Sequence, residues 1–597
     1  DFTGTAKGMG GDVTVTLTLE DGKITGCTAE GKDETPGIGT LALEQLPAQI
    51  AETGSIAVDG VSTATITSNA IKEAAAAALT AAGLNADDYK IEVKADETKA
   101  EDSTVDADVV IVGAGGAGMT AAITAAAEGK SVVIVESQPM VGGNSVRATG
   151  GMNAGKTVYQ DENEFGESAG VEKTLKAAAE KYADNETITA LAKTVSEQWA
   201  AYQANPTGYF DSVELMELDT MIGGKGINDP ALVETLCSNS ADAIDWLDEH
   251  GITLHSVSSF GGASVKRIHR PVDAEGKTVS VGSYMIPLLE ENCEKAGVQM
   301  MLNTTATEIL TDDNGAAVGI KATGASGETV TVNAKAVVLT TGGFGANLDM
   351  VVEYKPELKG FMTTNASGIL GQGIKMAQAI GADTVDMDQI QIHPTVEANT
   401  AALITEGLRG DGAVLINAEG KRFIDEVGTR DVVSAAEIAQ TGSYSWLVVD
   451  QAMVDASSVI QGYIKKGYTV TGETYEELGK AMGVDEAAFA ETMNTWNGYV
   501  EAKNDPDFGR TSFANKLDTA PYYAIKVTAG VHHTMGGLKI NTNTEVLNEN
   551  GEVIPGLFAA GEVTGGVHGA NRLGGNAVAD FTVFGRIAGA AASKYAA

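Results

Sequence analysis

The sequence predicts an α/β protein in which a doubly wound sheet follows a small α+β domain. Two observations predict this fold. From Ala107 onward, an apolar strand, a glycine-rich turn, an alanine-rich helix and a second apolar strand follow one another, which is the opening βαβ unit of such a sheet. Before that unit, residues 1–93 alternate strand-like and helical segments with turn signals between them.

The composition is that of a folded and acidic protein. Of the 597 residues, 81 are Asp or Glu and 40 are Lys or Arg, which gives a formal net charge of −41. A hydrophobic fraction of 43% supplies ample apolar material for a core. Because nucleic acids and anionic membrane surfaces attract clustered Lys and Arg, we expect neither of them as a partner.

The cysteines and the hydropathy exclude further classes. Cys27, Cys237 and Cys293 form no CxxC or CxxCH pair, so we expect no disulfide scaffold, zinc knuckle or c-type haem, and no metal site. No run of about 18 apolar residues occurs, so no transmembrane segment is expected. The chain begins at Asp1 rather than Met, which we interpret as an export signal that has been removed or left out.

The N-terminal α+β domain is expected at residues 1–93. Strands are predicted at 13–19 and 23–28, and helices at 42–53 and 69–82. Residues 94–105 are polar and charged and contain no aromatic side chain, which is typical of a linker.

A nucleotide-binding motif opens the next domain. Gly113, Gly115 and Gly118 form GxGxxG between a strand and a helix, and Glu136 ends the following strand. In this motif the first glycine makes the tight turn, the second lets the backbone approach a pyrophosphate and the third lets the helix pack on the sheet. Glu136 is placed to accept hydrogen bonds from ribose hydroxyls. The pattern predicts a Rossmann-like site for an adenine dinucleotide.

Further glycine-rich loops favour FAD over NAD. MVGGNS at 140–145 and RATGGMN at 147–153 could pass a long pyrophosphate and reach an isoalloxazine ring. PGLFAAGE at 555–562 resembles the segment that closes over the ribityl chain in many FAD enzymes. We therefore predict non-covalent FAD, with candidate contacts at Gly113, Gly115, Gly118, Glu136, Gly143, Asn144, Gly150, Gly151, Gly342, Glu562 and Asn576.

A second flavin is predicted in the N-terminal domain. Residues 59–68, DGVSTATITS, resemble the Dxx[ST]xA[ST] acceptor sequence of FMN-binding domains, in which a flavin transferase esterifies the FMN phosphate to a hydroxyl. The matching hydroxyl is that of Thr65, and Thr63 stands where Gly is more usual. A Ser/Thr-rich turn before a helix is also an ordinary N-cap. Beside an FAD domain, the resemblance favours covalent FMN at Thr65.

Five polar motifs follow one another in the second half of the chain: QIHPT at 391–395, TEGLRG at 405–410, GTRD at 428–431, VHHTMGG at 531–537 and HGANRLGGNA at 568–577. Through these motifs, the chain from about Asp106 to its end resembles the soluble fumarate reductase flavoproteins of the flavocytochrome c type, within the succinate dehydrogenase and fumarate reductase superfamily. Two departures stand out. An FMN-type domain replaces the haem domain, and a helical stretch at about 160–205 is an apparent insertion.

The resemblance implies a division into domains. An FAD-binding domain is expected at 106–384 and 526–597, with an inserted α+β capping domain at 385–525 that closes over the substrate. The FMN-binding domain at 1–93 precedes them. Electrons are then expected to pass from FMN to FAD and on to the substrate.

The resemblance also implies residue roles. Reducing an activated C=C bond needs a hydride from flavin N5 at one carbon and a proton at the other. Arg430 matches the proton donor of the family, and Glu406 and Arg409 match the relay that returns the proton from solvent. The sequence alone would have suggested a carboxylate clamp or salt bridge for Arg430, because a guanidinium hardly ever loses a proton.

Two pairs match the groups that hold the substrate carboxylates: His532 with Arg572, and His393 with Thr405. Both pairs together indicate a small unsaturated dicarboxylate, and fumarate reduced to succinate is the leading hypothesis. His533 and His568 are left as residues that line the flavin or cap a turn.

The resemblance further implies an exported, extracytoplasmic enzyme of anaerobic respiration, with a membrane quinol-linked or flavin-linked electron donor. The nearest alternative is the same mechanism on urocanate, methacrylate, itaconate or cinnamate, because Leu403 and Gly407 could alter the pocket. An FAD dehydrogenase that oxidises steroids would have no use for two carboxylate-binding pairs. A non-enzymatic flavin electron carrier fits residues 1–93 but leaves Arg430, His532 and Arg572 unexplained.

Overall fold

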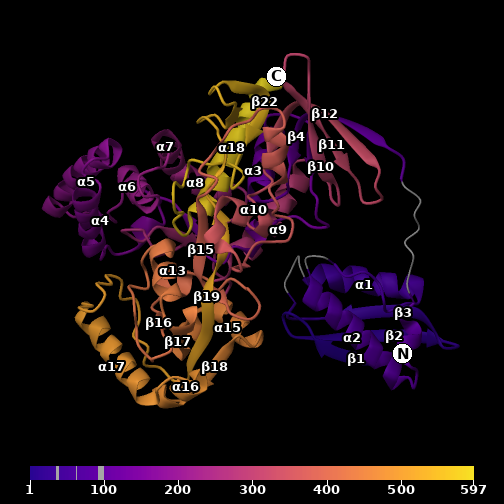
Figure 1. Cartoon of the computed structure of the whole chain (residues 1–597), viewed down its shortest axis with the longest axis horizontal. Helices are drawn as coiled ribbons and strands as arrows, with labels where there is room; N and C mark the ends of the chain where they lie inside the picture. The colour runs from indigo at the N-terminus through magenta and orange to yellow at the C-terminus, as the bar shows by residue number, and fades with distance from the viewer. Residues whose placement is uncertain (35–38, 62–63, 92–99) are drawn as a thin grey trace. The chain divides into compact units, whose positions relative to one another are not determined.

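A computed structural model of the chain describes residues 1–34, 39–61, 64–91 and 100–597 (Figure 1). The described residues fall into two units, Asp1–Asp102 and nearly all of the chain from Ser103 onward. Half of the expected linker, residues 94–99, lies outside the described residues, as do Ser62 and Thr63 of the expected FMN motif.

The first unit is a three-stranded antiparallel sheet with two helices packed on it. Its strands follow the order β1 (Phe2–Lys7), β2 (Asp12–Glu20) and β3 (Lys23–Glu30). Helix α1 (Gly39–Thr53) contacts β3, and α2 (Thr65–Ala81) contacts β1 and β2. Alternate residues of β2, namely Val13, Val15 and Leu17, are fully buried in one core with both helices, as the two-residue period of a strand requires.

The second unit is built on an eight-stranded sheet with a parallel centre. β4 (Ser103–Val112) lies between β12 (Thr329–Leu339) and β5 (Val132–Val135), and these three strands run parallel. The other strands are β9 (Gln299–Met301), β10 (Thr305–Thr311), β11 (Ala317–Thr323), β21 (Glu545–Leu547) and β22 (Val553–Ala559). The last four residues of β4 are all buried, as expected for a central strand covered on both faces. The glycine-rich turn therefore begins at the carboxyl end of this strand.

Two long helices pack against this sheet and on each other. α3 (Gly116–Ala127) follows β4, and α18 (Asn576–Tyr595) contacts it along its length. The approach is close because α18 carries glycines: a Cβ at Gly589 would lie 2.4 Å from the carbonyl oxygen of Ala121. The shorter helices around them are α9 (Val281–Lys295), α10 (Leu348–Tyr354) and α11 (Gln372–Gln378). No described helix has both the length and the apolar composition that a membrane span needs.

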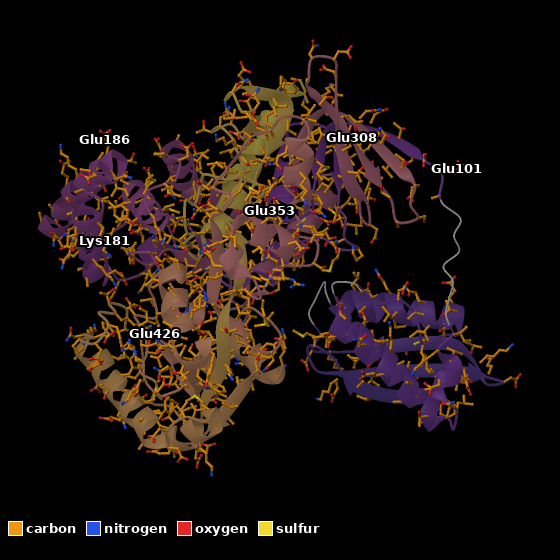
Figure 2. The ribbon with its side chains drawn as sticks, viewed as in Figure 1. Glu101, Lys181, Glu186, Glu308, Glu353 and Glu426 are labelled. Atoms are coloured by element: carbon orange, nitrogen blue, oxygen red, sulfur yellow. The ribbon has the colours of Figure 1, made fainter. Side chains whose placement is uncertain are left out.

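A helical region lies between two strands of a small sheet made of β6 (Met152–Asn153), β7 (Ser256–Ser258) and β8 (Ile268–Arg270). Its helices are α4 (Ser168–Lys181), α5 (Glu186–Ala204), α6 (Val213–Gly223), α7 (Pro230–Ser238) and α8 (Ser240–Glu249). In Figure 2, Lys181 and Glu186 mark the two ends of the turn that joins α4 to α5. An aromatic cluster around Trp199 holds this hairpin against α6.

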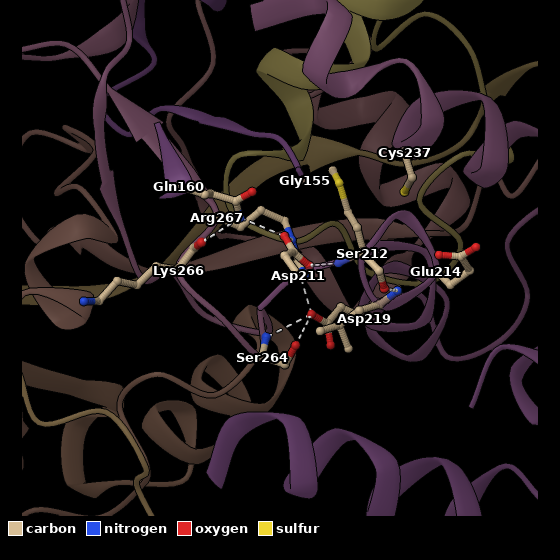
Figure 3. Close-up of polar contacts among 12 residues, drawn as sticks. Gly155, Gln160, Asp211, Ser212, Glu214, Asp219, Cys237, Ser264, Lys266 and Arg267 are labelled. Atoms are coloured by element: carbon tan, nitrogen blue, oxygen red, sulfur yellow. Dashed lines mark hydrogen bonds and ion pairs between the residues drawn. The ribbon is translucent and has the colours of Figure 1, made fainter. Parts of the chain in front are cut away.

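Arg267 ties the helical region to the loop before β8 (Figure 3). Its guanidinium donates two hydrogen bonds to Asp211, at 3.1 and 2.8 Å, and one to Asp219 on α6, at 2.7 Å. All three side chains are only 1% exposed. Burial by itself lowers the pKa of Arg267, but the two carboxylates more than offset it and raise the pKa overall. Ser264 and Gln160 donate to the remaining carboxylate lone pairs, so this buried charge network is fully hydrogen-bonded.

The capping part of the second unit is another sheet with helices on it. Its strands are β13 (Met362–Thr363), β15 (Ile390–Glu397), β16 (Val414–Ile416), β17 (Tyr444–Asp450), β18 (Thr469–Gly472) and β19 (Tyr522–Thr534). Its helices are α12 (Gly407–Gly410), α13 (Arg430–Ile438), α14 (Gln451–Ala456), α15 (Ser458–Lys465), α16 (Tyr475–Met482) and α17 (Glu486–Ala502). A two-stranded pair, β14 (Thr384–Val385) with β20 (Gly537–Leu538), lies next to it in the sequence.

Strand β19 passes straight through the expected domain boundary at 525/526. It pairs with β17 over residues 522–528 and with β15 over residues 527–534. Ile525 and Lys526 both pair with β17 inside the strand, so the chain makes no turn at the expected boundary. The same strand therefore begins in the expected capping domain and reaches His532 in the expected FAD-binding domain.

Replacing Arg267 with Met is expected to destabilise the second unit by about 3–5 kcal/mol, because two buried carboxylates lose their counter-charge. Guanidinium-induced unfolding followed by tryptophan fluorescence measures the change. The control is Lys321→Met, which breaks an exposed ion pair with Glu308 at 3.5 Å and should cost less than about 1 kcal/mol. Equal losses in the two variants would contradict the anchoring role of Arg267.

Candidate active site

The glycine-rich turn after β4 has two glycines that packing requires and one that faces open space. Gly113 has φ +105°, a left-handed conformation. A Cβ on Gly118 would lie 2.0 Å from the carbonyl oxygen of Gly113, so the helix could not approach the strand with any larger residue there. A Cβ on Gly115 would meet nothing nearer than the Ser145 hydroxyl oxygen, at 3.6 Å. The open side of Gly115, at the N-terminus of α3, is where a pyrophosphate fits.

Glu136 lies beside this turn, directly after β5. Its carboxylate accepts hydrogen bonds from the amides of Ala114, at 2.8 Å, and Gln138, at 2.8 Å. Burial raises the pKa of this carboxyl even though both amides act to lower it. The side chain is thus fixed next to the turn, in the position that the motif assigns to the ribose contact.

The remaining FAD candidates come from several segments. Asn144 accepts from the amide of Ala366, at 2.8 Å, and Asn576 accepts from the side chain of Asn153, at 2.8 Å. Glu562 accepts from the amide of Thr534, at 3.0 Å. Gly143 and Gly342 have positive φ, and a Cβ on Gly150 or Gly151 would clash with Phe260 or with the carbonyl of His269. These contacts hold the loops around the glycine-rich turn in place, and the open face of Gly115 leaves room for the pyrophosphate of an FAD.

The proton-relay candidates meet in one buried cluster. Arg430 begins α13, and its Nη2 and Nε lie 2.6 and 2.7 Å from one carboxylate oxygen of Glu406. Arg409, on α12, places Nη2 3.6 Å from the other oxygen. Burial acts to raise the pKa of Glu406, but Arg430 and Arg409 outweigh it and hold the pKa below its ordinary value. Glu406 is therefore an ionised carboxylate between two guanidinium groups.

His393 is a neutral hydrogen-bond donor in this cluster. Its Nδ1 accepts the amide hydrogen of Thr395, at 3.1 Å, so the ring hydrogen must be on Nε2. The Nε2 atom is buried and has no hydrogen-bond partner among the described residues. Burial and then the charge of Arg430 hold the pKa of His393 well below its usual range. An N–H group without a partner thus faces the cluster.

His532 lies beside His393, and Arg572 is a third buried guanidinium group whose charge acts on both rings. The rings of His532 and His393 are 5.0 Å apart, and His532 Nδ1 is 2.7 Å from the hydroxyl oxygen of Thr364. Burial and the charge of Arg430 hold the pKa of His532 well below its usual range. Burial, then Arg430, lowers the pKa of Arg572 to about 9, and its Nε has no partner among the described residues.

The charges in the cluster do not balance. Three guanidinium groups, those of Arg409, Arg430 and Arg572, are buried around one ionised carboxylate, that of Glu406. Two further carboxyl groups act on Arg572: Glu562, whose pKa is raised by burial, and Asp580, which is paired with His568. Such an excess of buried positive charge is costly unless an anion is bound.

Thr405 and His568 are both buried and form hydrogen bonds within the protein. Thr405 is fully buried, and its hydroxyl oxygen accepts from the amide of Gly407, at 3.2 Å. His568 lies 2.7 Å from a carboxylate oxygen of Asp580, and its ring is 5.6 Å from that of His533.

Sequence reasoning missed Gln391, which joins the two halves of the cluster. Its carbonyl oxygen accepts from Arg430, at 3.0 Å, and its amide donates to Asn571, at 2.8 Å, and to the backbone carbonyl of Arg572, at 2.6 Å. The signal was present in the sequence. Gln391 stands two residues before His393 in the same QIHPT motif, although an irregularity between Gln391 and Ile392 interrupts the regular alternation of β15.

The FMN candidate Thr65 is the first residue of α2 and is exposed. The next two hydroxyls are already used within the fold. Thr67 donates to Glu34, at 2.5 Å, and the Ser68 oxygen accepts from the amide of Val61, at 3.0 Å. Thr65 thus offers a hydroxyl at a helix N-terminus, where a phosphate is favoured.

Comparison with known families agrees with this geometry. The FAD binding domain family matches residues 108–210 and 198–578, and the FMN-binding domain family matches residues 8–80. The chain is 43% identical over 488 residues to the fumarate reductase (cytochrome) of Shewanella frigidimarina, covering 82% of this chain and 77% of that protein.

The chain is a flavoprotein of the succinate dehydrogenase and fumarate reductase superfamily. This confirms the predicted family, the fold class and the presence of FAD-binding and FMN-binding domains.

Other relatives of this flavoprotein differ in their named substrates. A urocanate reductase of Eggerthella lenta is 36% identical over 609 residues, covering all of this chain and 92% of that protein. An NADH:fumarate oxidoreductase of Klebsiella pneumoniae is 39% identical over 558 residues, and the flavoprotein spans 54% of its length. The solved open conformation of a flavocytochrome c3 fumarate reductase is 38% identical, with a TM-score of 0.61 and coverage of 82% and 79%.

Replacing Gly115 with Ala is expected to leave the fold of the flavoprotein intact but to weaken FAD binding at least tenfold, because the added methyl group occupies the open side of the turn. Flavin fluorescence titration of the apoprotein measures the affinity. The matched control is Gly118→Ala, whose methyl group clashes with the backbone and should lower the apoprotein melting temperature. The opposite pattern would show that the pyrophosphate binds elsewhere.

Proposed function

We propose that the protein reduces the C=C bond of a small unsaturated dicarboxylate, with fumarate to succinate as the leading case. The observation that carries the proposal is the buried cluster of three arginines around one ionised carboxylate. In a chain of net charge −41, an unbalanced cationic interior is best explained as the binding site of an anion.

The cluster offers donors for two carboxylates. One set is His532 with Arg572, whose Nε is unpartnered among the described residues, and the other is His393 with Thr405. An Arg fork fixes both the affinity and the orientation of a carboxylate. A substrate with carboxylates at both ends of its double bond would engage both sets and place its central carbons between them.

FAD, when bound, supplies the hydride to one of these carbons. Arg430 delivers the proton to the other carbon from its guanidinium, which lies on the same cluster. Arg409 then passes a proton to the ionised Glu406, and Glu406 passes a proton on to Arg430 through the 2.6 Å contact. Burial of these side chains excludes water and strengthens the charge interactions on which this transfer depends.

A second candidate keeps the mechanism and changes the acid. It is favoured by the relatives named for urocanate and, in an NADH:acrylate oxidoreductase of Vibrio harveyi that is 37% identical over 629 residues, for acrylate. A solved 3-ketosteroid-delta4-(5alpha)-dehydrogenase with 25% identity and a TM-score of 0.57 shares the scaffold. An uncharged steroid would leave the cationic cluster uncompensated.

The proposal extends to electron entry. FMN esterified to Thr65 accepts electrons from a membrane quinol-linked or flavin-linked donor and passes them to FAD. Such an enzyme would work outside the cytoplasm in anaerobic respiration. The exposed hydroxyl of Thr65 at the start of α2 supports the attachment.

Fumarate is expected to reoxidise the anaerobic, dithionite-reduced holoenzyme faster than urocanate, methacrylate, itaconate or cinnamate, because it alone in this panel pairs two carboxylates across an unsubstituted trans double bond. Flavin absorbance in a stopped-flow experiment gives the rates. The Arg430→Ala variant should keep FAD bound but react with fumarate about 10²–10⁴ times more slowly. Rapid reoxidation by urocanate with fumarate inert would move the assignment to the second candidate, and an unimpaired Arg430→Ala enzyme would remove the proposed proton donor.

Thr65→Val should abolish covalent FMN while leaving FAD in place, because the valine side chain has no hydroxyl to esterify. Mass spectrometry of the denatured protein, expressed together with a flavin transferase, reads the attachment directly. Thr80→Val, which alters an exposed hydroxyl near the other end of α2, is the control and should retain the FMN mass. A flavin still attached in Thr65→Val would locate the acceptor at another residue.

A further inference from the structure

Among the described residues, three ion pairs join the FAD-binding part to the cap, and all three have the same polarity. They are Lys173–Asp425 at 3.0 Å, Lys225–Asp431 at 2.9 Å and Arg270–Asp411 at 3.0 Å. In each pair the cation comes from the FAD-binding part and the carboxylate comes from the cap. The three aspartates are close in sequence to Arg409 or Arg430, so the pairs form with the segments that carry the proposed proton relay.

Lys225 has a backbone conformation that is unusual for a lysine. It lies in the sequence GGKG at 223–226, where α6 ends, and its φ of +58° is in the left-handed region. Residues other than glycine are uncommon in this region and remain there only where their surroundings hold them. A glycine would fit this position with less strain. The conformation therefore indicates that the lysine side chain itself has a use.

The side chain of Lys225 reaches the residue that follows Arg430. Its Nζ lies 2.9 Å from Oδ2 of Asp431, and Asp431 is in the first turn of α13. The other oxygen of this carboxylate, Oδ1, is buried and has no hydrogen-bond partner among the described residues. The ion pair with Lys225 therefore fixes the carboxylate and, with it, the beginning of the helix on which Arg430 is the first residue.

The same turn packs on the loop that carries Arg572. The amide of Ala570 donates a hydrogen bond to the carbonyl oxygen of Gly224, at 3.0 Å. A Cβ on Gly223 would lie only 2.5 Å from Cδ2 of Leu573, so no larger residue could pack there without displacing the loop. One turn therefore contacts both the loop before α18 and the start of α13, and it sets the spacing between them.

The helical stretch at about 160–205 supports this turn from the other side. Where α4 ends and α5 begins, the side-chain amide of Asn185 donates to the carbonyl oxygen of Gly226, at 3.2 Å. The Tyr182 hydroxyl donates to the carbonyl oxygen of Ile222, at 3.3 Å. Lys173 on α4 forms its own ion pair with the cap. In Figure 1 this helical region lies beside α13, as the ion pairs require.

We propose that Lys225 is a positioning residue, which holds Arg430 in place for proton delivery through its ion pair with Asp431. The role rests on the proposed function. Lys225 acts through Asp431 and takes no part in the proton transfer itself. Because 55% of its side chain is exposed, the pair contributes little to the stability of the fold. Its effect falls on the placement of the α13 N-terminus.

The test is a double-mutant cycle in the holoenzyme, with the best substrate of the acid panel. Lys225→Met removes the charge and keeps a long side chain, Asp431→Asn removes the charge of the partner, and the double variant lacks both charges. Each single variant should lower kcat at least fivefold with unchanged KM, because a small misplacement of a reacting group slows the chemical step. The double variant should be no slower than the slower single variant, since both residues act through one contact.

Three further measurements separate positioning from a general effect on the fold. Lys225→Arg keeps the cation and should retain at least half of the wild-type kcat. Lys176→Met, which removes an exposed lysine of α4 that pairs with Glu180 on the same helix at 3.8 Å, should have the wild-type kcat. Melting temperatures should stay within about 3 °C of wild type in all variants. Added salt should lower the wild-type kcat but not that of Lys225→Met, because salt screens an exposed ion pair.

The outcomes separate the two proposals. A Lys225→Met enzyme with the wild-type kcat overturns the role of Lys225 while the reductase function stands. Losses of kcat that multiply in the double variant show two independent effects and also overturn it. So does a Lys225→Arg enzyme as slow as Lys225→Met, because the charge would then not matter. A wild-type holoenzyme that reduces none of the acids overturns the proposed function and this role with it.

Discussion

The buried ion pair between Arg430 and Glu406 is the interaction on which the rest of the site depends. It joins α13 to the loop before α12, and its surroundings are shaped around it. A Cβ at Gly261 would lie 2.5 Å from one carboxylate oxygen of Glu406, and a Cβ at Gly574 would lie 2.4 Å from the other. The backbone at Gly261 and Gly574, in the FAD-binding part, therefore packs closely against the Glu406 side chain, which belongs to the cap. Removing one partner of such a pair leaves an uncompensated buried charge, which is far more costly than losing a surface pair.

The second buried network, around Glu426, gives the first one its rigidity. Arg422 and Arg510 are balanced by the carboxylates of Glu426 and Asp505, and both guanidinium groups lie over Trp496, at 4.1 and 4.9 Å from its ring centroid. Arg510 also donates to the backbone carbonyl of Arg409, at 2.8 Å. Arg409 thus contacts two charge clusters: the cluster around Glu426 is balanced, and the cluster around Glu406 has an excess of positive charge. This contrast separates structural charge from charge that is kept available for a ligand.

The sequence predicted the parts of the fold whose signals are local. The apolar run of β4, the glycines of the turn and Glu136 are close together in the chain, and strand and helix periodicity accounts for them. The substrate cluster could not be derived in this way, because His393, Glu406, Arg430 and His532 come from different elements of the capping sheet and Arg572 comes from a loop before α18. Only the family resemblance brought these residues together in advance. Gln391 was missed although it stands in the QIHPT motif, whereas Glu426 was missed because it supports other residues, and such a role has no motif.

The hydrogen position on His393 also determines which chemical groups the distal end of the site accepts. Because the Thr395 amide occupies Nδ1, the ring can only donate from Nε2, and a change of tautomer is blocked. His393 therefore favours a group that accepts a hydrogen bond. A carboxylate or a carbonyl oxygen satisfies Nε2–H, whereas an ammonium, an amide N–H or a protonated imidazole placed there would set two donors against each other. In the proposed function, discrimination among unsaturated acids at this end would therefore depend on the donor or acceptor character of the substrate as much as on its size.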